Sequence, residues 1–118
     1  MKVTIIDYGA GNVPSVERAL DRLGAKSERT GSPEDISKAR VLLLPGVGHY
    51  SALVRALDEQ NMRAPLVDAI GRGVPCLGIC LGLQVLFESS AESPQLRGLS
   101  LLLGKVRALP SGVTLPHM

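Results

Sequence analysis

Short apolar runs alternate along the chain with stretches of helical character. Three apolar runs have the length and composition of strands, at residues 3–6, 41–44 and 74–79, and a weaker strand is expected near residues 25–29. Helical stretches are expected between them, at residues 13–23, 33–39, 51–57 and 65–72. Strands that alternate with helices predict an α/β protein with a flavodoxin-like, doubly wound and mostly parallel sheet.

A glycine-rich turn follows three of the predicted strands, at residues 9–11, 45–48 and 78–82. In a doubly wound sheet the carboxyl ends of the strands form the edge where ligands bind, so we expect the functional residues in these turns. The first turn lacks the third glycine and the Lys-Ser/Thr ending of a nucleotide-binding loop, and a structural turn is expected there.

Cys80 lies between Gly78 and Gly82, where an apolar strand meets the start of a helical pattern. This placement predicts a sharp strand-to-helix turn that exposes the sulfur, and the helix start would favour the thiolate. A lone cysteine in an apolar run is more often a small buried side chain. The paired glycines and the following Gln84 favour a nucleophile instead.

A cysteine nucleophile needs a base and backbone N–H donors directed at the developing oxyanion. The N–H of Leu81 is one natural donor, and the glycine turn at 46–48 is a second source. Two histidines are available as a base. A loop or substrate-wall role is expected for His49, with general base as the alternative, and a structural or interface role is expected for His117.

The remaining polar and sulfur groups have simpler interpretations. Glu88 and Glu92 follow a helix in a polar loop and are expected to be solvated charges. Cys76, four residues before Cys80 in the same strand, is expected in the core, and a disulfide between the two is disfavoured. The cysteines lack the other ligands of a zinc site, so no metal and no cofactor are predicted.

Composition narrows the class of protein. The 118 residues are enough for one domain, and the formal net charge of +2 comes from 13 basic and 11 acidic residues spread along the chain. Because there is no basic stripe and there are few aromatic residues, nucleic acid is not expected as a partner. Nor does any stretch approach the roughly 20 apolar residues of a membrane span. The N-terminus does not read as a secretory signal, so a cytoplasmic location is expected.

Beyond Phe87 the pattern becomes irregular, with a polar loop at 88–94, an apolar run at 99–103 and a further strand expected at 105–109. The sequence then stops at Met118 without a closing helix. We therefore expect residues 1–118 to be the N-terminal portion of a single domain.

Taken together, these segments resemble the class I glutamine amidotransferases, and most closely the glutaminase subunits of imidazole glycerol phosphate synthases. The resemblance rests on the turns at 7–12 and 44–48, the elbow at 78–84 with the 86–88 segment, and the segments 98–100 and 116–118. The elbow alone would indicate only the broad class. The first turn and the Pro-His-Met ending narrow the resemblance from the broad class to the glutaminase subunits of imidazole glycerol phosphate synthases.

The resemblance implies that the cysteine attacks the side-chain amide of L-glutamine, releases ammonia and leaves a thioester that water hydrolyses. The ammonia would pass to a cyclase subunit that makes imidazole glycerol phosphate and aminoimidazole carboxamide ribotide. The implied roles are nucleophile for Cys80, oxyanion hole for Gly46, Val47, Gly48 and the Leu81 N–H, substrate contacts for Gln84 and Gly82, and cyclase-facing positions for Asn12, Pro116 and His117.

Family members also carry a His-x-Glu pair, in which the histidine is the base for the cysteine, and this pair does not occur in these 118 residues. The chain is therefore expected to be C-terminally truncated and weakly active or inactive alone. Two alternatives stay open. One is a non-catalytic flavodoxin-like interaction module derived from this family, and the other is the glutaminase of a different amidotransferase.

Overall fold

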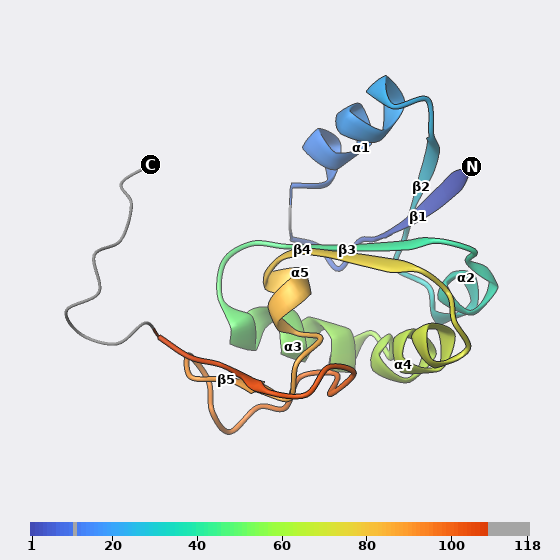
Figure 1. The fold of residues 1–118 in the computed structure, drawn as a ribbon. Helices are drawn as coiled ribbons and strands as arrows, with labels where there is room; N and C mark the ends of the chain where they lie inside the picture. Colours follow the sequence, from blue (N-terminus) through green and yellow to red (C-terminus); the bar gives the residue numbers. More distant parts are fainter. Residues whose placement is uncertain (11, 109–118) are drawn as a thin grey trace.

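The computed structural model describes residues 1–10 and 12–108, and its centre is a four-stranded parallel sheet (Figure 1). The strand order is β2-β1-β3-β4, with every neighbouring pair parallel. The strands are β1 (Lys2–Ile6), β2 (Lys26–Thr30), β3 (Leu42–Gly46) and β4 (Cys76–Cys80). The predicted mostly parallel α/β sheet is confirmed, with strand bounds within two residues of those expected.

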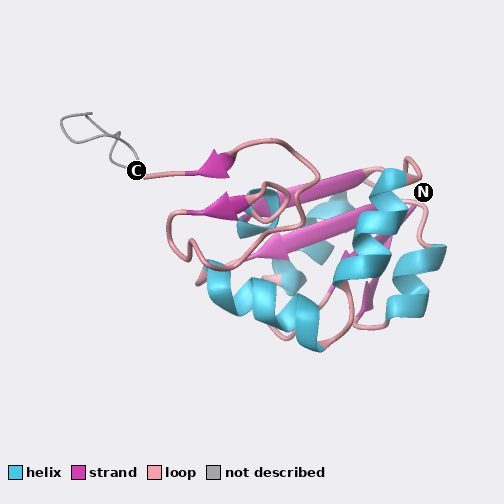
Figure 2. Ribbon diagram, turned by 90° about the horizontal axis from the view of Figure 1, so that it is seen from below, coloured by secondary structure: helices cyan, strands magenta, loops and turns pink. Residues whose placement is uncertain are grey.

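Helices cover the sheet on both faces. One face carries α1 alone, and the other four helices lie on the opposite side, where the view in Figure 2 shows helices crossing the strands. The helices are α1 (Val13–Arg22), α2 (Pro33–Lys38), α3 (Tyr50–Glu59), α4 (Arg63–Gly71) and α5 (Leu81–Gln84). Each connects parallel strands or follows the last one, which is the doubly wound arrangement.

Two separate cores follow from the alternation of side chains along the strands. Beneath α1, the side chains of Val3, Ile5 and Leu43 are buried together with Val13. On the other face, the larger core contains the alternate strand positions and the buried sides of α2 to α5, including Ile6, Ile36, Leu42, Leu44, Leu53, Leu57 and Leu66. The central strands β1 and β3 are therefore covered on both faces and hold the sheet in register.

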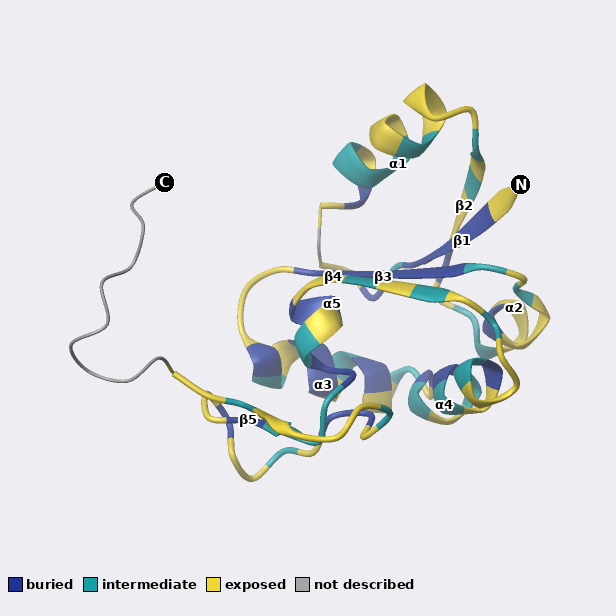
Figure 3. Cartoon of the chain, in the orientation of Figure 1, coloured by how far each residue is buried: buried dark blue, intermediate teal, exposed yellow. Residues whose placement is uncertain are grey.

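The continuous apolar run at 74–79 is typical of a buried strand, and that interpretation is wrong for one face of β4. Leu77 is 58% exposed and Ile79 is 37% exposed, and Figure 3 shows exposed segments along this strand. The register places Leu77 beside Leu43, on the face that carries α1. Because α1 packs over β1 and the Leu43 side of β3, it leaves this face of β4 open.

The segment after β4 has little regular structure, in agreement with the irregular pattern of the sequence beyond Phe87. Helix α5 spans four residues, and β5 (Ser89–Ser90) pairs in parallel with β6 (Lys105–Val106). The strand expected at 105–109 is thus found at its first two positions, and Leu109 lies outside the described residues. The guanidinium of Arg63 ties the segment to α4 by donating to the carbonyl oxygens of Arg97 (2.9 Å) and Gly98 (2.5 Å).

Candidate active site

Cys80 occupies a strained turn between a strand and a helix. It is the last residue of β4 and the N-cap of α5, with φ 54° and ψ −118°. A non-glycine residue in such a conformation costs on the order of 1–3 kcal/mol and persists only where the surrounding structure imposes it. The turn leaves Cys80 exposed, as the sequence predicted. Both its position and its backbone are those of a nucleophile elbow.

Three glycines impose this turn because α5 lies directly on the backbones of β3 and β4. A Cβ at Gly82 would stand 1.8 Å from the Leu44 carbonyl oxygen. At Gly78 or Gly46 a Cβ would meet backbone atoms of Gly82 at 2.7 Å. Side chains at these positions would push α5 away from the sheet and open the turn. The glycines singled out by the sequence are therefore required by packing.

The predicted oxyanion residues lie next to Cys80. Gly46 is paired in register with Cys80 across β3 and β4, and the turn to α3 begins directly after it. In that turn Val47 is 52% exposed, and Gly48 has a φ of 89°. Leu81 directly follows Cys80 at the start of α5. The turn after β3 and the first residue of α5 thus meet at the elbow, and an oxyanion hole would need backbone N–H groups from such segments directed at the substrate.

A cavity of about 460 Å³ lies beside the thiol on the open face of β4. It is lined mainly by apolar side chains of α1, β3 and β4, and Asn12, Val47 and Cys80 also line it. Asn12 is exposed, and Gln84 is the half-buried last residue of α5. Of the predicted cyclase-facing positions, the structure thus places Asn12 at the same cavity as Cys80, whereas Pro116 and His117 lie outside the described residues.

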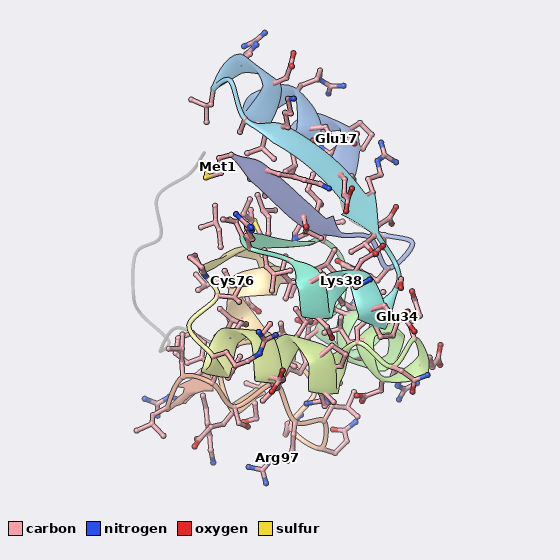
Figure 4. The ribbon with its side chains drawn as sticks, turned by 90° about the vertical axis from the view of Figure 1, so that its right-hand side faces the viewer. Met1, Glu17, Glu34, Lys38, Cys76 and Arg97 are labelled. Atoms are coloured by element: carbon pink, nitrogen blue, oxygen red, sulfur yellow. The ribbon has the colours of Figure 1, made fainter. Side chains whose placement is uncertain are left out.

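Cys76 lies at the opposite end of the same strand. Figure 4 faces the side where the strands begin, with Met1 and Cys76 both labelled there. The Cys76 side chain is half-buried against the larger core, and burial raises the pKa of its thiol to about 11. Both cysteines are free. The two thiols therefore differ in exposure, and the half-buried Cys76 thiol is protonated near neutral pH.

Glu92 is exposed, as the sequence predicted, and its carboxylate also makes specific contacts. One carboxylate oxygen lies 3.0 Å from Nδ1 of His49 and accepts the Tyr50 N–H at 3.1 Å. These contacts join the loop after β5 to the turn between β3 and α3. No periodic pattern relates residues 43 positions apart, so the sequence offered no signal for this contact.

The first glycine turn packs against the oxyanion turn through Tyr8, a residue that the sequence analysis did not single out. Asp7 shapes this turn by accepting the Gly9 N–H at 3.1 Å. Tyr8 is 7% exposed, and its hydroxyl makes no hydrogen bond of standard geometry to any residue that the structure describes. Burial raises the pKa of this phenol, and the nearby Val47 backbone lowers it by less.

No group of three His, Cys, Asp or Glu side chains is arranged to hold a metal ion within residues 1–10 and 12–108. In the same residues, none of the helices has the length and apolar character needed to cross a membrane.

A doubly wound parallel sheet with a strained cysteine at a strand-to-helix turn defines an α/β protein of the nucleophile-elbow type. Residues 4–112 match the family model "Glutamine amidotransferase class-I". A solved structure described as a glutamine amidotransferase aligns with 94% of this chain and 58% of its own, with a TM-score of 0.79 and 20% identity, which supports the fold. The chain belongs to the class I glutamine amidotransferase family.

Two relatives named "Imidazole glycerol phosphate synthase subunit HisH" are considerably more similar in sequence. The protein from Moorella thermoacetica is 48% identical over 98% of this chain and 55% of its own length. The protein from Methanopyrus kandleri is 45% identical over 100% of this chain and 58% of its own length. This chain therefore spans little more than half the length of these relatives.

Proposed function

We propose that this chain carries the nucleophile half of a glutaminase subunit of imidazole glycerol phosphate synthase. The observation that carries the proposal is the strained Cys80 elbow, next to the turn after β3, in a chain 45–48% identical to subunits of that name. The reaction is hydrolysis of glutamine to glutamate and ammonia. The ammonia is supplied to a cyclase subunit that makes imidazole glycerol phosphate and aminoimidazole carboxamide ribotide.

In this reaction the sulfur of Cys80 forms a bond to the side-chain carbonyl carbon of glutamine. The N–H groups of Leu81 and of the turn at 46–48 stabilise the negative charge that develops on the carbonyl oxygen. The C–N bond then breaks and the nitrogen leaves as ammonia after gaining a proton. Water cleaves the remaining thioester to give glutamate and the free thiol. Gln84 and Gly82 contribute to binding the glutamine.

The base is the part of the mechanism that these residues do not provide. Family resemblance assigns it to a His-x-Glu pair, which has no counterpart in the sequence. Loss of a general base typically reduces the rate by about 10² to 10⁴. Turnover by the 118 residues alone is therefore expected to be weak or undetectable, and trapping of the nucleophile is a cleaner test than turnover.

The cyclase is proposed to dock at the edge of the sheet where the strands end. Asn12 is exposed there and lines the same cavity as Cys80, so a partner at this edge would lie where ammonia is released. Pro116 and His117 are further proposed contacts.

The test is intact-mass measurement of covalent labelling by a chloroketone analogue of glutamine at neutral pH. The expected result is one label on Cys80, none on Cys76, and no label in Cys80→Ser. Absence of labelling, or equal labelling of the two cysteines, would show that the site does not bind and activate the substrate.

The open face of β4 gives the interaction-module alternative a specific basis, because Leu77 and Ile79 are exposed beside the thiol. Labelling separates the two functions. A module that only binds another protein needs no selective reactivity at Cys80.

A further inference from the structure

We propose that Glu92 is a positioning residue for the turn at 46–48, holding its backbone N–H groups in place through His49 and Tyr50. The inference rests on the proposed glutaminase function, in which this turn supplies the oxyanion donors. It assigns a role to a contact that the sequence did not reveal.

One end of the turn is fixed by the sheet. Gly46 is paired with Cys80 in the β3–β4 register, and its backbone packs against Gly82 at the start of α5. Residues 47–49 then cross to α3 without regular structure. A segment of three residues with one fixed end keeps a defined direction only if its other end is also held.

At the other end, the His49 carbonyl accepts the N–H groups of Ala52 and Leu53, and one carboxylate oxygen of Glu92 supplies the side-chain contacts. This oxygen accepts the N–H of Tyr50 at 3.1 Å and lies 3.0 Å from the His49 ring. His49 is the N-cap residue of α3, and its own side chain makes no capping bond within the described residues. Glu92 therefore serves as the cap from a distant loop, and a carboxylate at the N-terminus of this ten-residue helix is favoured by the helix dipole.

Both partners of this contact are themselves anchored. The Tyr50 side chain is fully buried in the larger core. On the other side, the Glu92 N–H donates to the Ser90 hydroxyl at 3.3 Å, and Ser90 is 2% exposed in β5. The neighbouring Ala91 N–H donates to the Val106 carbonyl at 2.7 Å. The carboxylate is thus presented by a tethered loop and does not rely on a free surface side chain.

The contact also sets the form of the imidazole. A carboxylate only accepts hydrogen bonds, so the Nδ1 atom of His49 must carry a proton, and in the neutral ring Nε2 is then the unprotonated nitrogen. The His49 side chain is 85% exposed, so no other packing orients it strongly. Loss of Glu92 is therefore expected to change both the His49 tautomer and the direction of the preceding peptides.

The first experiment measures the turn directly by nitrogen–proton NMR of the 118-residue chain. In Glu92→Ala, the amide resonances of Val47 and Gly48 are expected to shift, and the His49 ring is expected to lose its Nδ1–H form. Glu92→Gln keeps an accepting oxygen and is expected to restore most of the wild-type amide spectrum. Unchanged Val47 and Gly48 resonances in Glu92→Ala would overturn the proposal.

Glu88→Ala is the matched control. Glu88 lies four residues earlier, and its side chain makes no hydrogen bond or ion pair to any residue among 1–10 and 12–108. The same substitution there removes a carboxylate without touching the turn, so the amides of Val47 and Gly48 are expected to stay in place.

The second experiment tests the link to chemistry by comparing reagents at Cys80. Glu92→Ala is expected to slow labelling by the chloroketone analogue by at least about tenfold, because its carbonyl oxygen uses the oxyanion donors. An analogue without the α-amino group is expected to show the same loss. Labelling by iodoacetamide, which needs no oxyanion hole, is expected to change less than about twofold.

Each outcome of the second experiment decides a stated point. If the labelling rate falls only with the analogue that carries an amino group, Glu92 contacts the substrate directly. If the rate falls by a similar factor with iodoacetamide, the substitution disrupts the site in general. Either result overturns the proposal. If the wild-type chain resists the chloroketone while the turn amides respond to Glu92→Ala, the glutaminase function fails and the positioning of the turn stands.

Discussion

The backbone of Cys80 is strained because its neighbours leave no other path for the chain. Gly82, Gly78 and Gly46 let α5 approach the strands more closely than any side chain would allow. The strain is thus maintained by packing around the elbow, because an unusual backbone conformation persists only where the surrounding structure imposes it. Substitutions at these glycines test this directly.

Gly82→Ala is expected to lower the free energy of unfolding by about 3 kcal/mol, at the upper end of overpacking effects, because the added methyl group would meet the Leu44 carbonyl. Urea denaturation measures the change. Gly71→Ala is the control, since nothing lies within 4 Å of a Cβ there and alanine is the better helix former by up to about 1 kcal/mol. Equal destabilisation of both variants would contradict the packing account.

The two thiols are expected to differ in their rate of modification at neutral pH. Only the thiolate reacts, and burial raises the pKa of Cys76 to about 11, so its modification should be slow at neutral pH. In Cys80→Ser, the rate of iodoacetamide labelling should rise about tenfold for each pH unit between roughly pH 7 and 10. The exposed Cys80, measured in Cys76→Ser, should react much faster at pH 7. Similar rates for the two thiols at pH 7 would show that Cys76 is not buried.

At the scale of elements, β4 is covered on one face and open on the other. The strand contributes Cys76 to the larger core and ends at the elbow, yet Leu77 and Ile79 face the cavity beside α1. Helix α1 packs over Leu43, one strand nearer the centre. The elbow therefore depends on β3 and α5 for its support, with little contribution from the face that carries α1.

Identical substitutions on adjacent strands are expected to have unequal effects. Leu43→Ala removes a side chain that is 4% exposed and should lower the free energy of unfolding by about 2–4 kcal/mol. Leu77→Ala removes one that is 58% exposed and should cost less than about 1 kcal/mol. Urea denaturation of the two variants checks the difference, and a large effect at Leu77 would show that the open face is covered in solution.

At the scale of the whole molecule, the edge strand β4 has one uncovered face, and this face lies next to the candidate site. Exposed Val47, Leu77 and Ile79 gather around the cavity that also contains Cys80. Contiguous exposed apolar surface commonly marks a place where another surface packs. The relatives are nearly twice as long as this chain, so their additional residues are available to cover such a face.

The 118-residue chain is expected to self-associate through this face. Sedimentation velocity should show an average mass that rises with protein concentration. The double variant Leu77→Thr with Ile79→Thr should reduce association, because it removes apolar area while retaining β-branched side chains suited to a strand. Association that is unaffected by these substitutions would place the contact elsewhere.

The sequence by itself determined the order of strands and helices, the glycine turns at the strand ends and the Cys80 elbow. These features are local, because strand runs, helical spacing and turn glycines are encoded by neighbouring residues. The resemblance of the turns then led to the family, which the family model confirms.

Only the tertiary structure decided what lies far apart in the chain. It joined Glu92 to His49 and Tyr50, brought Tyr8 against the Val47 backbone, and left one face of β4 open. A continuous apolar run looks the same whether one or both faces of its strand are covered, because coverage depends on where a distant helix packs. A loop glutamate likewise carries no sign of its partner, since that contact exists only after the sheet and helices have brought the two segments together.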